Sequence, residues 1–199
     1  MKAIYADWHT LYPNGGNGKE FPYLLEKILA NSKYNKLLTT RRSAESKLNP
    51  MWNNILDYGC GKGGTIRWLK DIIKVHIDGY DPGHPDYNVM PQKEWDLVYT
   101  ADVLEHIEKE DLNETITSIQ NMAFQNIHII DLTSAKKHLP DGRNAHVTLL
   151  PIYDWQEILE APGIHEIVDM RKWSVPDKNF NKRERLCCTT REVVRRKSA

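Results

Sequence analysis

From Asn53 onward, short apolar runs alternate with segments in which apolar residues recur at helical spacing. The apolar runs predict four strands, at Ile55–Tyr58, Val75–Tyr80, Trp95–Thr100 and Ile127–Leu132. Apolar residues at helical spacing predict two helices between these strands. One contains Ile66, Leu69, Ile72 and Ile73, and the other contains Leu112, Ile116, Ile119 and Met122. Alternating strands and helices predict an α/β fold with a parallel sheet covered by helices.

The end of the chain departs from this alternation. Ile164–Met170 and Leu186–Thr190 are strand-like, and the polar stretch between them has no clear helix. We therefore expect these two strands to form an antiparallel pair that closes one edge of the sheet.

Residues 1 to 50 are more polar and rich in turn-forming residues, and only one helix is predicted there, at about Pro22–Ala30. We predict an N-terminal cap or lid at residues 1–50 and the main domain at residues 51–199. Aromatic residues beside the glycine-rich Asn14–Gly18 would form the lid, whereas a leader packed on the surface is the alternative.

The composition is that of an ordinary globular protein, and it narrows the class of partner. Lys plus Arg equals Asp plus Glu, at 27 each, so the chain has no overall attraction for nucleic acid or an anionic membrane. The three cysteines include an adjacent pair and form no CxxC motif, which favours a reduced, cytoplasmic setting. There is no signal peptide and no apolar run of the ~20 residues that cross a bilayer.

A glycine-rich turn at Asp57–Gly64 follows the first predicted strand, and Asp81 ends the second. Glycines let the backbone approach a ligand, and a carboxylate at Asp81 can accept hydrogen bonds from ribose hydroxyls. The GxGxxG spacing also fits a dinucleotide site. Asp57 favours S-adenosylmethionine, because a carboxylate repels a pyrophosphate and attracts the ammonium group of that cofactor. The alternative is that Asp57 only caps a neighbouring turn.

Three segments resemble motifs of the class I S-adenosylmethionine-dependent methyltransferases. Ile55–Gly63 is similar to their first motif, Tyr80–Pro82 to their acidic second motif, and Trp95–Ile107, with its sequence VLEHI, to their fourth-strand motif. The resemblance covers about residues 53–132. It implies a doubly wound, Rossmann-like, mostly parallel sheet of seven strands, in which the last strand is inserted antiparallel.

By this resemblance, S-adenosylmethionine is the cofactor and three groups of residues bind it. They are the glycine turn with its acidic approach, the end of the second strand and the end of the fourth-motif strand. The residues are Asp57, Tyr58, Gly59, Cys60, Gly61, Gly63, Asp81, Pro82, Thr100, Asp102 and Val103. No residue is assigned to the adenine ring.

The loop Thr133–His146 begins where the Ile127–Leu132 strand ends, a common place for substrate contacts. Its sequence from Leu139 to His146 resembles that of uncharacterised bacterial and phage-type methyltransferases, similar to types 11 and 12. If the acceptor is a hydroxyl, His146 and His106 are the candidate catalytic proton acceptors.

Arg143 and Asn144 of the same loop are the candidate substrate-binding residues. For three of these four residues, a purely structural role is the alternative. In these alternatives, His106 only hydrogen-bonds a nearby loop, His146 only fixes its own loop, and Arg143 only pairs with Asp141.

These patterns predict a methyltransferase that modifies an oxygen or nitrogen of a small molecule. A non-catalytic module that binds S-adenosylmethionine is the alternative, and an NAD-dependent oxidoreductase is a weaker one. The sequence has no HExxH and no Cys and His cluster at ligand spacing, so no metal is expected. A nucleic-acid acceptor is disfavoured, because Thr100–Val103 stands where a Pro-Pro-Tyr or Pro-Pro-Phe motif would follow the strand.

Overall fold

The computed structural model describes residues 28, 52–92, 94–176 and 182–193. These residues fall into two compact units, one within Lys2–Gln92 and the other within Lys93–Ala199. The predicted lid and the predicted boundary after residue 50 lie outside the described residues. Within the first 50 residues only Ile28 is described, and it is helical and buried.

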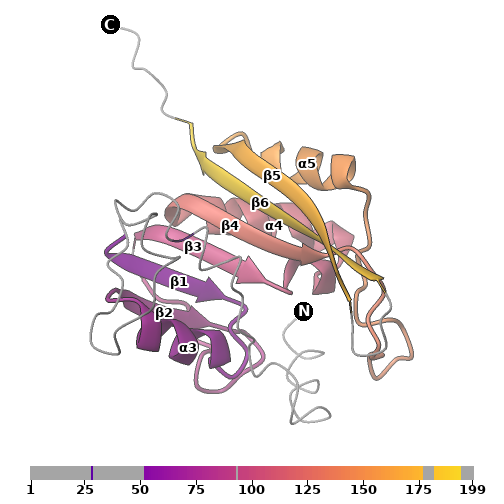
Figure 1. Cartoon of the computed structure of the whole chain (residues 1–199), viewed down its shortest axis with the longest axis horizontal. Helices are drawn as coiled ribbons and strands as arrows, with labels where there is room; N and C mark the ends of the chain where they lie inside the picture. Colours follow the sequence, from indigo (N-terminus) through magenta and orange to yellow (C-terminus); the bar gives the residue numbers. More distant parts are fainter. Residues whose placement is uncertain (1–27, 29–51, 93, 177–181, 194–199) are drawn as a thin grey trace, which may run out of the picture. The chain divides into compact units, whose positions relative to one another are not determined.

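The first unit is built from β1 (Asn54–Tyr58), α3 (Gly64–Ile72) and β2 (His76–Tyr80) (Figure 1). The two strands are parallel, with Asn54 opposite His76 and Tyr58 opposite Tyr80. Helix α3 buries Thr65, Ile66 and Leu69, which lie on one face at helical spacing. The predicted strand, glycine turn, helix and strand therefore follow one another as expected.

The described residues of the second unit form four strands and two α-helices, which are labelled in Figure 1. In chain order they are β3 (Trp95–Ala101), the short 3₁₀ turn η1 (Leu104–His106), α4 (Lys109–Asn121), β4 (Ala123–Asp131), α5 (Ile152–Glu160), β5 (His165–Pro176) and β6 (Lys182–Glu192). The strand order is β3-β4-β6-β5. Strands β3 and β4 are parallel, whereas β6 is antiparallel to both of its neighbours. The last strand is thus inserted antiparallel, as predicted.

Strand β4 supplies much of the core of the second unit. All of its residues except Phe124 are buried, which suits the apolar Ile127, Ile129 and Ile130, and the buried set also includes polar side chains such as His128. Helix α4 contacts β4, α5 contacts β5, and the two helices contact each other, so they cover the same face. The fold is α/β with parallel strands and an antiparallel end.

Two features differ from the sequence prediction. Helix α5 was not predicted, because it is short and half polar, although Ile152, Trp155 and Leu159 have helical spacing. Six strands are present in the described residues in place of seven, and residues 81–92 between β2 and β3 form turns. No helix among the described residues is long and apolar enough to cross a membrane.

The packing of α5 can be tested with two leucines of the second unit. Leu159 on α5 is fully buried, whereas Leu149, in the loop before the helix, is 40% exposed. We expect Leu159→Ala to lower the free energy of unfolding by about 2–5 kcal/mol, because it leaves a cavity, and Leu149→Ala to lower it by less than about 0.5 kcal/mol. Urea unfolding measures both, and equal losses would contradict the packing of α5.

Candidate active site

The glycine turn after β1 has a backbone that few residues other than glycine adopt. The φ angles of Gly59, Gly61 and Gly63 are 83°, 53° and 68°, all in the left-handed region. A Cβ atom on Gly63 would also meet the ring of Tyr87, whose Cζ lies 3.0 Å from that position. The three glycines are therefore needed for the shape of the turn.

Hydrogen bonds to the end of β2 hold this turn in place. The carbonyl of Tyr80 accepts from the amides of Gly59 and Cys60, at 2.7 and 3.1 Å. The amide of Gly61 donates to Oδ2 of Asp81 at 2.8 Å, and the amide of Gly83 donates to Oδ1 at 2.9 Å. The structure thus brings together the first and second predicted motifs, with the carboxylate of Asp81 between them.

The interior of the turn is acidic. Asp57 and Asp81 are both buried. Burial raises the pKa of the Cys60 thiol, and the carboxylates of Asp57 and Asp81 raise it further. Burial likewise raises the pKa of the Tyr58 phenol, with added contributions from Tyr80 and Asp81. Burial is the larger cause of both shifts, and the contributions of the carboxylates indicate a negative potential, which favours a cationic ligand and opposes a phosphate.

All the predicted cofactor residues of the first unit lie in this region. The ring of Tyr58 packs at 5.1 Å from that of Tyr80, and Pro82 follows Asp81 in a turn closed by a 3.2 Å bond from the His84 amide to the Asp81 carbonyl. The assignment of these residues to the cofactor stays a prediction.

In the second unit, the VLEHI segment leaves β3 and forms the η1 turn. Asp102 has a positive φ of 56°, which turns the chain sharply before Glu105 and His106. The side chain of Glu105 is fully buried, and its Oε1 accepts from the amide of Asp131 at 3.0 Å. The carbonyl of Glu105 accepts from the amide of Thr148 at 3.1 Å. Glu105 thus ties η1 to the end of β4 and to the loop that follows His146.

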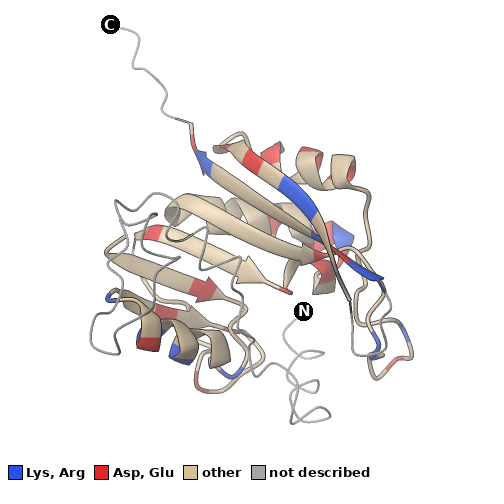
Figure 2. Ribbon diagram, viewed as in Figure 1, with Lys and Arg blue, Asp and Glu red and all other residues tan. Residues whose placement is uncertain are grey.

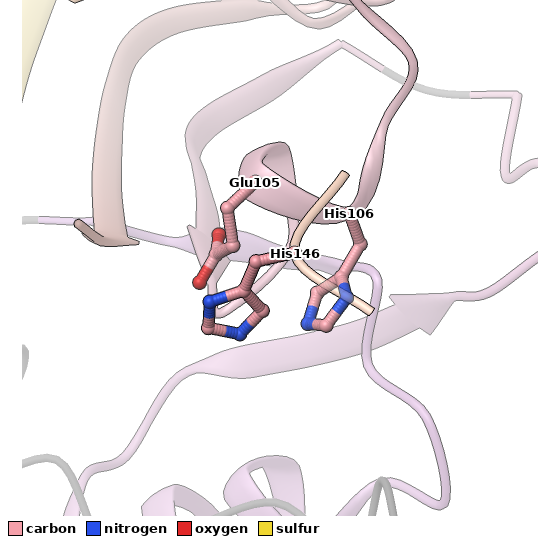
Figure 3. Close-up of side chains that lie close together, drawn as sticks. All are labelled: Glu105, His106 and His146. Carbon is pink, nitrogen blue, oxygen red and sulfur yellow. The ribbon is translucent and has the colours of Figure 1, made fainter. Parts of the chain in front are cut away.

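His106 and His146, the predicted proton acceptors, lie together (Figure 3). Their ring centroids are 4.7 Å apart and the rings are nearly perpendicular. Nδ1 of His106 is 2.7 Å from the carbonyl of Ala145, and Nδ1 of His146 is 2.5 Å from that of Thr133. A carbonyl can only accept, so each Nδ1 carries the proton and each Nε2 carries a lone pair.

Both histidines are neutral near pH 7. Burial, followed by the neighbouring His146, lowers the pKa of His106 to about 4, and burial also lowers the pKa of His146. The contacts to Ala145 and Thr133 also agree with the alternative in which the two histidines have only a structural role and fix nearby loops. A loop-fixing bond through Nδ1 is compatible with a chemical role for Nε2.

Asn144 and Arg143, the predicted substrate-binding residues, both have partners within the protein. The side chain of Asn144 accepts from the amides of Ala135 and His146, at 3.0 and 2.9 Å, and donates to the carbonyl of Ala135. Arg143 pairs with Asp141 at 2.8 Å and with Glu108 at 2.7 Å; Arg143 and Asp141 are exposed, and Glu108 is half-buried. Asn144 therefore shapes the loop that presents His146, and substrate binding by either residue stays a prediction.

The predicted residues at the end of β3 are also engaged. Thr100 is fully buried, with its hydroxyl 3.0 Å from Nδ1 of His128. Asp102 forms a two-pronged ion pair with Arg185 of β6, and Val103 precedes η1. Their assignment to the cofactor stays a prediction.

A charge network at this end of the second unit was missed from the sequence. Asp131 pairs with Arg183 at 2.6 Å and with Arg185 at 3.4 Å, and Arg185 also pairs with Asp102. Both arginines lie on β6, one of the strands that carry basic residues in Figure 2. The only sequence signal was their alternate spacing, which places them on one face of a strand.

Comparison with known proteins identifies the family. Residues 21–164 match the family model described as a methyltransferase domain. The chain belongs to this family. The match confirms the prediction, made from the glycine turn and the VLEHI segment, of an S-adenosylmethionine-dependent methyltransferase. A search of curated proteins found no match.

Solved structures of methyltransferases share the fold at low sequence identity. The magnesium protoporphyrin IX methyltransferase of Synechocystis PCC 6803, with bound S-adenosylmethionine, is 17% identical with a TM-score of 0.56, covering 96% of this chain and 97% of its own. The 1,6-didemethyltoxoflavin-N1-methyltransferase of Burkholderia thailandensis, with bound S-adenosylhomocysteine, is 14% identical with a TM-score of 0.53, covering 70% and 71%.

A small RNA methyltransferase is 13% identical with a TM-score of 0.53, and covers 86% of this chain but 24% of its own. The names of these three proteins include both small-molecule and RNA methyltransferases. The shared fold therefore does not identify the methyl acceptor.

The strain at Gly63 of this methyltransferase can be separated from the effect of its φ alone. Gly142 also has a positive φ, of 86°, but a Cβ there would meet nothing within 4 Å. We expect Gly142→Ala to cost about 1–2 kcal/mol of unfolding free energy and Gly63→Ala to cost more, because Tyr87 must also move. Adding Tyr87→Ala should reduce the excess in a double-mutant cycle. An excess that Tyr87→Ala leaves unchanged would contradict the contact.

Proposed function

We propose that this methyltransferase transfers a methyl group from S-adenosylmethionine to an oxygen or nitrogen of a small molecule. The observation that carries the proposal is the acidic glycine turn, in which two buried carboxylates, Asp57 and Asp81, flank a backbone that only glycines allow. When bound, the cofactor would supply an electrophilic methyl group.

The turn fits this cofactor better than it fits a dinucleotide. S-adenosylmethionine has an ammonium and a sulfonium but no phosphate, so a negative potential attracts it, whereas the pyrophosphate of NAD is repelled. We assign the ammonium end to the side of Asp57 and the ribose hydroxyls to Asp81. The bonds from Gly61 and Gly83 fix the Asp81 carboxylate, and each carboxylate oxygen can accept more than one hydrogen bond.

On the acceptor side, we propose that His146 accepts a proton if the nucleophile is a hydroxyl, with His106 as the second candidate. The support is the Nε2 lone pair that the Nδ1 bond to Thr133 leaves on His146. His106, with a pKa of about 4, is a weak base near neutral pH. Arg143 remains our candidate for holding an anionic group of the acceptor, because its guanidinium is exposed at the protein surface.

A small-molecule acceptor is supported by the equal numbers of acidic and basic residues and by the lack of a Pro-Pro-Tyr or Pro-Pro-Phe motif. The purified protein, given S-adenosylmethionine with a labelled methyl group, should label an ultrafiltered metabolite extract. Matched RNA and protein fractions serve as controls. Label confined to either macromolecular fraction, or transfer to none of the three, would overturn the proposal.

The role of Asp81 can be tested by calorimetric titration with S-adenosylhomocysteine. Asp81→Asn removes the charge and keeps one accepting oxygen, which can hold the Gly61 amide while the bond to the Gly83 amide is lost. We expect binding to weaken at least about ten-fold, because a hydrogen bond to a charged group contributes about 1.5–3 kcal/mol.

Asp86→Asn is the matched control. It removes the same charge from the same unit, at a carboxylate that is 81% exposed. Its affinity should stay within about two-fold of that of the parent, because exposed charges are screened. If Asp81→Asn binds as tightly as Asp86→Asn, the assignment of Asp81 to the ribose is wrong.

A further inference from the structure

Three side chains that can bind metal ions converge in the second unit. Glu105 and His106 come from η1, and His146 comes from the loop after β4; Figure 3 shows the three pointing toward one another. One ligand atom from each side chain lies within 4.8 Å of the other two. Glu105 and His146 are buried and His106 is half-buried.

We propose that Glu105, His106 and His146 bind a divalent transition-metal cation such as Zn²⁺, Co²⁺ or Mn²⁺. Two imidazole nitrogens and one carboxylate oxygen suit such ions, whereas Mg²⁺ and Ca²⁺ prefer oxygen ligands alone. No other group of three ligating side chains occurs in the described part of the chain.

The histidine tautomers are already those of metal ligands. Each Nδ1 donates to a backbone carbonyl, of Ala145 or Thr133, so Nε2 is the ring nitrogen that carries the lone pair. Metal-binding histidines almost always have such a bond on the other ring nitrogen, because it fixes the tautomer and the ring orientation.

The environment of Glu105 supports the metal site independently of the histidines. Its side chain is fully buried, and its Oε2 has no hydrogen-bond partner among the described residues. A buried carboxylate oxygen without a partner is costly, and a cation would satisfy it.

The surrounding charges leave Glu105 as the unbalanced group. Asp102 and Asp131 are neutralised by Arg185 and Arg183, so these two carboxylates and two guanidiniums sum to zero. The negative charge of an ionised Glu105 is then the one charge of this group that a bound cation would balance.

The geometry requires only a small adjustment. Ligand atoms about 2.1 Å from one ion lie roughly 3–4 Å apart, so side-chain shifts of about 1 Å would bring the three ligand atoms to coordination distance.

Three protein ligands leave coordination positions open, as in catalytic metal sites. If the proposed function holds, an oxygen of the acceptor could occupy one of these positions. The ion and a proton would compete for Nε2 of His146, so metal binding and the proton-acceptor role exclude each other.

The test is direct metal binding by the full chain after treatment with a chelator. Co²⁺ titration followed by visible absorption, and equilibrium dialysis against Zn²⁺ and Mn²⁺, should give one ion per chain. His146→Gln and Glu105→Gln should weaken the affinity at least about ten-fold. His138→Gln, an exposed histidine of the same loop, should bind as the parent does. A parent chain that binds no ion, or variants that bind as tightly as the parent, would overturn the proposal.

Two further measurements keep the outcome clear. Titration with S-adenosylhomocysteine on the same samples reports folding and the cofactor site separately: cofactor binding without metal binding refutes only the metal site, and the reverse refutes only the proposed cofactor site. If a variant does not fold, NMR of the parent decides. Co²⁺ should shift the ring protons of His106 and His146 more than those of His138, and the opposite order would contradict the site.

Discussion

The buried carboxylate of Asp81 holds the glycine turn against the end of β2, and the candidate cofactor site depends on this contact. Without an acceptor there, the Gly61 amide would lose its partner, and the bonds of Gly59 and Cys60 to Tyr80 would remain to link the turn to the end of β2. Glu105 acts similarly in the second unit, where it accepts the Asp131 amide and ties η1 to β4. In each unit, a buried carboxylate thus fixes a short backbone segment beside predicted site residues.

The parts of the fold that the sequence predicts are those governed by local patterns. Strands β1, β2, β3 and β4 are short apolar runs, and α3 and α4 repeat apolar residues at helical spacing, so neighbouring positions alone identify them. Helix α5 was missed because it is short and half polar, and its position depends on contacts with α4 and β5. The glycine turn was predictable because its backbone requires glycines at fixed spacing.

The second unit shows why the rest of the site could not be predicted. The pairs of Asp102 with Arg185 and of Asp131 with Arg183 join residues that are distant in the sequence, and they depend on the register of β4 with β6. His106 and His146 were predicted as single candidates, but neither their contact nor the buried Glu105 beside them follows from spacing. For the same reason, no metal was expected from the sequence, whereas the folded chain brings three ligating atoms together.

Hydrogen exchange measured with and without S-adenosylhomocysteine tests the central claim, that the acidic glycine turn binds the cofactor, most directly. The account predicts slower exchange at the amides of residues 59–64 and 81–83 when the ligand is present, because ordering the turn suppresses local opening. Ligand binding that leaves exchange in both segments unchanged would place the cofactor elsewhere and contradict the account.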